Sequence, residues 1–121
     1  MNSLSGIVID ETATYTKAIK KLKKRFKSIE DDCDKFIQSI ETTDDLRAEL
    51  GNGVYKVRIA NGDKKVGKRG GYRLISYLKL IDNKLYLMYI YDKSDFSTVT
   101  EKQIDAFITQ LSLTLHLAND S

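Results

Sequence analysis

The side chains with the most chemical potential in this sequence are arginines, lysines and tyrosines that gather in its second half. Between Val54 and Lys84 only two acids, Asp63 and Asp82, oppose a much larger set of cations. The whole chain carries a net charge of only +3, so its positive charge is concentrated here. Such a field predicts a polyanionic partner. The cations are Lys56, Arg58, Lys64, Lys65, Lys68, Arg69, Arg73, Lys79 and Lys84.

The spacing of these residues brings several of them onto one face of a predicted sheet. Lys56 and Arg58 are two positions apart and point the same way, and Arg73 begins the neighbouring strand. Tyr89 and Tyr91 share a face of the next strand, about 4.8 Å away. Arginine binds phosphate and stabilises transition-state charge, a crowded lysine can act as a base, and tyrosine can stack on a base or donate a proton. This set suits RNA cleavage through the 2′-hydroxyl and equally suits RNA binding without reaction.

Other catalytic chemistries have little support in the sequence. Cys33 is the single cysteine and His116 the single histidine, which excludes an internal disulfide and leaves almost no basis for a zinc site. Cys33 fits the apolar stripe of a helix, and His116 suits the dipole at a helix end. The loop Gly67–Gly71 lacks the spacing of a nucleotide-binding phosphate loop. We therefore expect neither a metal nor a cofactor.

Length and composition predict one domain over residues 1–121. An apolar content of 41% is enough for one core, and the 31% of charged residues are mixed in sign, which argues against disorder. No apolar run approaches the roughly 18 residues that a membrane helix needs, and Met1–Ser5 does not resemble a signal peptide. We expect a cytoplasmic protein without a membrane partner.

The N-terminal third predicts a strand followed by two helices. Ser5–Asp10 alternates like a short strand, and the apolar residues that follow recur at steps of three and four. A capping box at Ser28 and Asp31 favours a helical hairpin, Ala13–Lys27 and Ile29–Glu41, over one continuous helix. The first helix is rich in cations, which form either a solvated face or a second contact to RNA phosphates. They include Lys20, Lys24 and Lys27, beside Lys17, Lys21, Lys23 and Arg25.

The remaining sequence predicts three strands and a final helix. Thr42–Gly53 is interpreted as a loop, and the strands are Val54–Ala60, Tyr72–Leu80 and Lys84–Tyr91. The strand that begins at Tyr72 is apolar on both faces and therefore central. A capping box from Thr98 to Glu101 opens the last helix, whose apolar face is Ile104, Phe107, Ile108, Leu111 and Leu115. The predicted class is α+β, with a small, mostly antiparallel sheet packed by helices in the order β-α-α-β-β-β-α.

Several motifs resemble those of a known toxin family. The run from Lys20 to Asp32 resembles the helical hairpin of RelE/ParE-superfamily toxins. Tyr55–Arg58, the stretch Gly67-Lys68-Arg69-Gly70-Gly71-Tyr72-Arg73 and Tyr91–Ser94 look like strand motifs of its RelE/HigB-like branch. The resemblance covers roughly Ala13 to Leu111, with two departures: Tyr72 stands where some members have a smaller residue, and Ser76 interrupts an apolar strand.

The resemblance implies a toxin that is paired with an antitoxin of the helix-turn-helix type and that cuts mRNA in the ribosomal A site. It implies phosphate-binding or catalytic roles for Arg58, Lys68, Arg73 and Lys93, and stacking or proton donation by Tyr91. Arg73 is expected at an exposed strand edge. Lys56, Lys64, Lys65 and Arg69 would contact RNA or the ribosome, as would Lys20, Lys24 and Lys27. The alternatives are a ParE-like inhibitor of DNA gyrase and a non-catalytic RNA-binding module.

Overall fold

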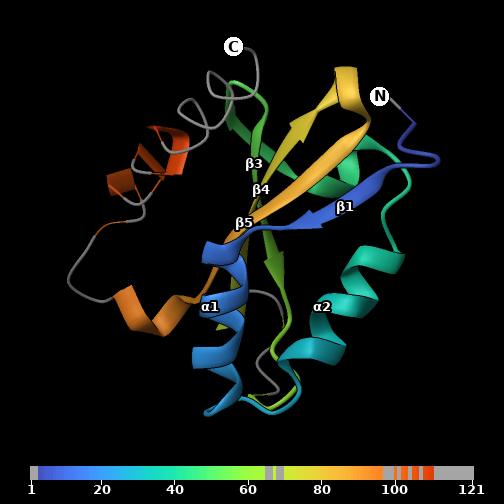
Figure 1. Ribbon diagram of the computed structural model, residues 1–121. Helices are drawn as coiled ribbons and strands as arrows, with labels where there is room; N and C mark the ends of the chain where they lie inside the picture. Colours follow the sequence, from blue (N-terminus) through green and yellow to red (C-terminus); the bar gives the residue numbers. More distant parts are fainter. Residues whose placement is uncertain are drawn as a thin grey trace.

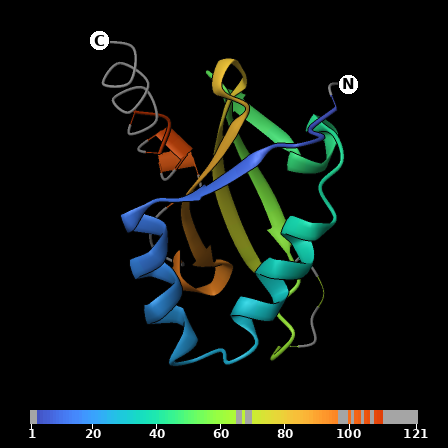
Figure 2. The ribbon, with the colours of Figure 1, turned by 45° about the vertical axis from the view of Figure 1, so that its right-hand side comes forward.

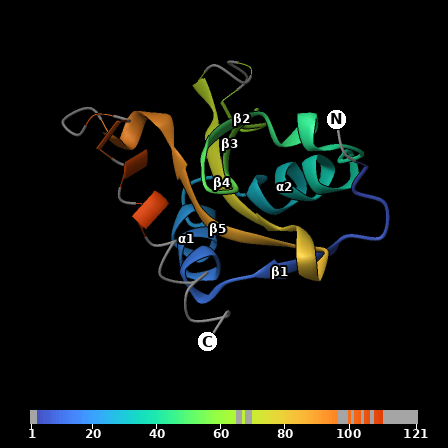
Figure 3. The same ribbon diagram turned by 90° about the horizontal axis from the view of Figure 1, so that it is seen from above.

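A five-stranded sheet forms the centre of the protein. The computed structural model describes residues 3–64, 67, 70–96, 100, 102–103, 105–106 and 108–110. The strand order is β1-β5-β4-β3-β2 (Figure 3), with β1 parallel to β5 and every other pair antiparallel. The predicted α+β class and mostly antiparallel sheet are therefore confirmed. The strands are β1 (Val8–Glu11), β2 (Ala48–Gly51), β3 (Val54–Ile59), β4 (Tyr72–Lys79) and β5 (Lys84–Asp92).

Two helices lie in front of the sheet as a hairpin (Figure 2). They are α1 (Ala13–Lys23) and α2 (Ile29–Gln38), so the hairpin is confirmed and the continuous helix is excluded. Both helices end earlier than predicted. Thr12 caps α1 by accepting a hydrogen bond from the Tyr15 backbone N–H at 3.2 Å. The capping box predicted at Ser28 is wrong, because the Ser28 hydroxyl instead donates to the Asp32 carboxylate at 2.9 Å.

The predicted loop Thr42–Gly53 contains regular structure. A short 3₁₀ helix, η1 (Thr43–Leu46), is followed by β2, which pairs with the start of β3. The loop prediction and the four-strand count are therefore wrong. Other bounds differ by a few residues: β1 starts at Val8, and Leu80 belongs to a second 3₁₀ segment, η3 (Leu80–Asp82).

A third helical region follows β5, after the 3₁₀ segment η4 (Lys93–Phe96). The described residues between 102 and 110 are helical. The capping box here joins Thr100 and Gln103, each accepting from the other's backbone N–H at 3.2 Å. The predicted partners Thr98 and Glu101 lie outside the described residues, as do Ile104, Phe107, Leu111, Leu115 and His116.

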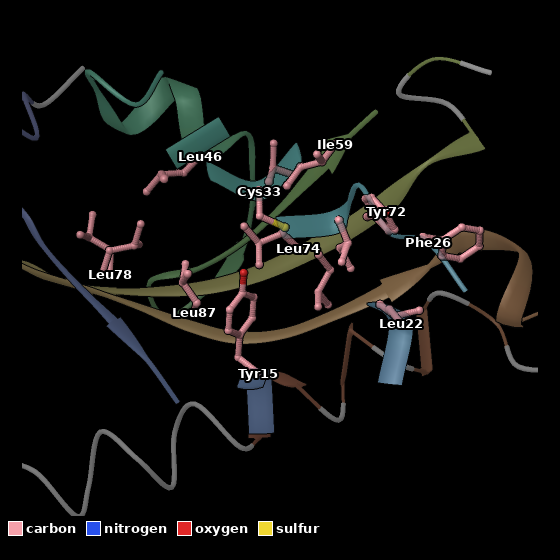
Figure 4. Close-up of a cluster of buried hydrophobic side chains, with 14 of the residues drawn as sticks. Tyr15, Leu22, Phe26, Cys33, Leu46, Ile59, Tyr72, Leu74, Leu78 and Leu87 are labelled. Carbon is pink, nitrogen blue, oxygen red and sulfur yellow. The ribbon is translucent and has the colours of Figure 1, made fainter. Parts of the chain in front are cut away.

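The main core lies between the hairpin and the sheet (Figure 4). Tyr15 and Leu22 of α1, Cys33 of α2, and Leu74 and Leu87 of the sheet are among its buried members. Cys33 is 2% exposed, and burial is the main cause that raises the pKa of its thiol to about 11. The thiol is thus protonated at neutral pH, and the prediction of a core cysteine is confirmed.

A second cluster covers the opposite face of the sheet. Ile75 and Tyr77 of β4 pack there with Tyr91 of β5 and with Ile108 of the final helical region. The central strand β4 is therefore buried on both faces, as its sequence predicted. None of the helices formed by the described residues is long and apolar enough to cross a membrane.

The turn after β3 is held close to the turn between α1 and α2, at the lower end of the molecule in Figure 1. The Gly62 N–H donates to the Asp32 carboxylate at 2.9 Å, and the Ser28 N–H donates to Asp63 at 3.2 Å. At Gly71 the backbone passes very close to the end of β3: a Cβ atom there would lie 2.1 Å from the Ile59 carbonyl oxygen. Only glycine permits this approach of the two backbones.

Replacing Gly71 by alanine should lower the free energy of unfolding by about 3 kcal/mol, because the added methyl must displace backbone atoms. Urea unfolding of purified protein measures this. Gly67→Ala is the matched control in the same loop. Its φ of +72° carries a backbone penalty of about 1 kcal/mol, but no atom lies within 4 Å of its added Cβ. Equal losses in the two variants would contradict the close-approach explanation.

Candidate active site

Three side chains predicted to act together lie in one row across the sheet. Arg58 of β3 pairs with Arg73 of β4, and Arg73 pairs with Tyr91 of β5. Their neighbours Tyr72 and Leu74 belong to the core under the helical hairpin. Because side chains alternate along a strand, the row lies on the opposite face, where Tyr91 packs with Ile108.

The row runs from solvent into the interior. Arg58 is exposed on β3, whereas Arg73 is only 1% and Tyr91 only 2% exposed. The prediction of an exposed Arg73 at a strand edge is wrong, because β4 is the central strand and is covered on both faces. The Arg73 guanidinium donates to the Tyr72 carbonyl oxygen at 3.3 Å. Only the Arg58 end of the row is directly open to a ligand.

The final helical region covers part of this face. Asp105 accepts a hydrogen bond from Lys56 at 3.1 Å, and the Lys56 side chain is only 16% exposed. Lys56, predicted to contact RNA, is therefore engaged in an internal ion pair. Ile108 packs in the same cluster as Tyr91.

Arg58 also lines a groove at the edge of β3. The groove has a volume of about 900 Å³ and lies between α2, η1 and β3. Phe36, Val57 and Ile59 contribute apolar surface, while Lys35 and Arg47 add cations beside Arg58. The groove lies on the hairpin side of β3, whereas the Arg58 side chain belongs to the row on the other face, so the groove and the row are separate.

Tyrosines gather beside the row. The Tyr89 and Tyr91 rings are stacked, with centroids 6.1 Å apart. Ser76 pairs with Leu87 and Ile75 with Tyr89, so Met88 is an extra residue in β5. This bulge sits beside Ser76, the small residue that interrupts the apolar run of β4. Burial is the main cause that raises the pKa of Tyr89, and this keeps its hydroxyl protonated at neutral pH.

At the C-terminal end of β5, Asp92 forms a buried ion pair with Lys64. Asp92 is 0% exposed, and its carboxylate accepts hydrogen bonds from Lys64 at 2.6 Å and from the Ser94 N–H at 3.2 Å. Burial alone would raise the pKa of Asp92, but the Lys64 and Ser94 hydrogen bonds and the Lys64 charge outweigh it, so this pKa is lowered. Lys64, predicted to bind RNA, is therefore used to neutralise a buried acid.

Lys93 follows this pair and is exposed. Its backbone N–H donates to the Gly71 carbonyl oxygen at 3.1 Å, which places it two positions beyond the Arg73–Tyr91 pair. Three further predicted site residues, Lys65, Lys68 and Arg69, lie outside the described residues.

A comparison with protein families identifies the chain. The model of the family described as RelE toxin of the RelE / RelB toxin–antitoxin system matches residues 13–121. The chain belongs to the RelE toxin family. It is thus the toxin of a toxin–antitoxin system, and this membership implies an antitoxin partner. None of the curated protein sequences matches it.

The cations of the first helix in this RelE-family toxin lie on a different surface from the row. Lys20 is on α1, Lys24 and Lys27 follow its end, and all three are exposed. Two neighbours are engaged in ion pairs, Lys23 with Glu30 and Arg25 with Asp95. Because α1 packs on the hairpin side of the sheet, its outer cations and the row face different directions.

Three acids of this RelE-family toxin have roles that the sequence did not predict: Asp92 in a buried ion pair, and Asp105 and Asp95 as partners of Lys56 and Arg25. A single acid directly after an apolar strand in a basic segment was the available signal for Asp92. In the part of the chain that the structure describes, no group of three or more His, Cys, Asp or Glu side chains could hold a metal ion.

The Asp92→Asn variant should lose about 3 kcal/mol of stability at neutral pH, because it leaves Lys64 without its buried counter-ion. The depressed pKa gives the loss a definite pH dependence. The wild-type advantage is present above the unfolded pKa of about 3.9 and disappears as pH falls through the lower folded value. Urea unfolding from pH 7 to pH 2 measures it. A difference between wild type and variant that persists unchanged at pH 2 would contradict this assignment.

Proposed function

We propose that this toxin cleaves mRNA on the ribosome by attack of an RNA 2′-hydroxyl on the adjacent phosphate. The alignment of Arg58, Arg73 and Tyr91 across three strands of a RelE-family chain supports this proposal best. In this reaction the 2′-oxygen forms a bond to phosphorus, and the bond from phosphorus to the 5′-oxygen breaks. The products are a 2′,3′-cyclic phosphate and a new 5′-hydroxyl end.

The proposed roles follow from position and chemistry. Arg58, at the open end of the row, binds the scissile phosphate, and Arg73 behind it stabilises the added negative charge. Lys93 or Lys68 accepts the proton that the attacking 2′-hydroxyl loses, or these lysines add further phosphate contacts. Tyr91 stacks on a base or donates the proton that the leaving 5′-oxygen needs, and this role requires the final helical region, which packs on Tyr91 through Ile108, to move aside when RNA binds. No step in this scheme calls for a metal or a cofactor, and an mRNA substrate places the toxin in the cytoplasm.

Arg58→Ala tests the scheme with least risk to the fold, since Arg58 is exposed and no acid among the described residues is paired with it. Loss of one charge-assisted phosphate contact costs about 2 kcal/mol, or about thirtyfold in cleavage rate. Primer extension on ribosome-bound mRNA measures the rate. Arg47→Ala, another exposed arginine of the groove but outside the row, is the control and should cleave at the wild-type rate.

An Arg58→Ala variant that cleaves at full rate would show that the site is misplaced. Arrested growth with intact mRNA and an induced DNA-damage response would instead indicate the gyrase-inhibitor alternative. Harmless expression without antitoxin would indicate a non-catalytic RNA-binding module.

We further propose that the antitoxin, of the helix-turn-helix type, covers the cations on and after α1 with an acidic segment. Among the described residues no acid is paired with Lys20, Lys24 or Lys27, so they are available to a partner. The same side chains would contact the ribosome, and a bound antitoxin would then block ribosome entry without touching the row.

Reversing all three charges, Lys20→Glu, Lys24→Glu and Lys27→Glu, should weaken binding to both ribosome and antitoxin by at least about tenfold at low salt, with a reduced salt dependence. Pull-down and ribosome sedimentation across a salt series measure this. Lys35→Glu, Arg47→Glu and Lys102→Glu together change the charge equally at other exposed positions and serve as the control. If the Lys20, Lys24 and Lys27 triple variant binds ribosome and antitoxin as tightly as wild type, these three lysines do not form the proposed contact surface.

A further inference from the structure

A buried carboxylate lies where three segments of the proposed active site meet. Asp92 stands between Tyr91 and Lys93 in the sequence, and its side chain is completely buried. All its described hydrogen bonds reach Oδ2: from the Lys64 ammonium at 2.6 Å, the Ser94 N–H at 3.2 Å and the Ser94 hydroxyl. A buried charge with such partners fixes the geometry of the groups around it.

One of these bonds shapes the chain around Lys93. A carboxylate that accepts from the N–H two residues later forms an Asx turn, and Lys93 is the central residue of this turn. Its own N–H is bonded to the Gly71 carbonyl oxygen. The backbone of Lys93 is therefore held from both sides, while its side chain is exposed.

The second bond ties down the start of the basic loop. Lys64 leaves the turn after β3, where its N–H donates to the Asn61 carbonyl oxygen at 3.1 Å. Its ammonium reaches Asp92, donates to the Ser94 hydroxyl at 3.1 Å, and lies 5.4 Å from the centre of the Phe26 ring. Lys64 thus joins the beginning of the loop that carries Lys68 and Arg69 in sequence to the end of β5.

The location of Asp92 makes it compatible with an anionic substrate. Asp92 pairs in register with Tyr72, a member of the hairpin core, so its side chain lies on the face away from the Arg58–Arg73–Tyr91 row. Its charge is neutralised by Lys64 within the protein. It can therefore order the neighbouring cations without repelling RNA.

We propose that Asp92 is the positioning residue of this active site: with Lys64 it holds Lys93 and the start of the basic loop in place beside the row. The proposal rests on the cleavage function proposed above. Asp92 does not touch the substrate and acts through Lys93 and Lys64. Its contribution is the fixed placement of cations that a flexible connection would leave mobile.

Four variants test the proposal in single-turnover cleavage of ribosome-bound mRNA. Asp92→Asn keeps the shape of the side chain but removes its charge. Lys64→Met removes the positive charge that neutralises Asp92. Each should lower kcat by about tenfold with KM within about twofold, because the phosphate-binding cations remain but are misplaced. Lys64→Arg keeps the charge and should restore most of the rate. Asp95→Asn, which removes an exposed ion pair with Arg25 in the adjacent η4, is the control and should leave kcat unchanged.

A pH profile separates positioning from a general loss of structure. Without Lys64, the buried Asp92 carboxyl stays protonated to a higher pH. Cleavage by Lys64→Met should therefore recover as pH rises from 5 to 8 by a larger factor than in wild type. A profile parallel to wild type, or a change in KM instead of kcat, would overturn the proposal.

Amide hydrogen exchange gives a readout that does not depend on cleavage. In Asp92→Asn the Lys93 amide should exchange about tenfold faster, while the Ile90 amide within β5 keeps its protection. If the wild type cleaves no RNA, the cleavage function fails, and the exchange result still decides whether Asp92 positions Lys93. If the wild type cleaves and Asp92→Asn cleaves equally fast with Lys93 equally protected, the positioning role alone is overturned.

Discussion

The burial of β4 on both faces is the constraint on which the rest of this structure depends. Every residue of β4 is buried, with β3 and β5 at its sides, the hairpin core on one face and the cluster around Ile108 on the other. A guanidinium in such a strand cannot keep its hydration shell, so Arg73 needs protein partners. The same topology puts Arg58 one strand nearer the edge and in solvent. The gradient of exposure along the row is thus a direct consequence of strand order.

The acids of this protein determine which of its many cations remain available. Lys56 is paired with Asp105, Lys64 with Asp92, and Lys79 with Asp82, and in each pair the lysine is at least three-quarters buried. These lysines stabilise the sheet and its connections. Among the described residues, the exposed cations without an acidic partner are fewer than the sequence suggests. They include Arg58, Lys93, and the cations on the outer side of α1 and in the turn that follows. The described part of the chain therefore presents a polyanion with a smaller set of available cations than its composition implies.

The features predicted well from sequence are those whose pattern directly reports burial. Alternation in β3, the unbroken apolar run of β4 and the three-four spacing of the hairpin each encode one or two buried faces. Strand β2 was missed because its four residues are exposed or half-buried and are held by pairing with β3. The capping box of Thr100 and Gln103 was not predicted, because Thr98 and Thr100 each have an acid or amide three positions later and the local sequence does not distinguish between them.

The proximity of three candidate site residues was predictable from the sequence, and the ion pairs around them were not. The two-residue spacing brought Arg58, Arg73 and Tyr91 together correctly as cross-strand neighbours. The ion pairs could not be predicted, because Asp92 is 28 positions from Lys64 and Asp105 is 49 positions from Lys56. Only the fold brings such residues into contact. A local excess of cations in the sequence therefore does not reveal that some of these cations pair with acids far away in the chain.

The remaining exposed cations of the described residues lie on two separate surfaces. The row lies on one face of the sheet and the outer cations of α1 on the other, so one short stretch of RNA cannot contact both without wrapping around the protein. The two surfaces are nevertheless joined at one end, where Arg25 bonds Asp95 in η4, next to Lys93. Asp95 is three positions from the buried Asp92, so this ion pair links the α1 side of the sheet to the end of β5. The proposed binding surface and the proposed active site are distinct in location but share this connection.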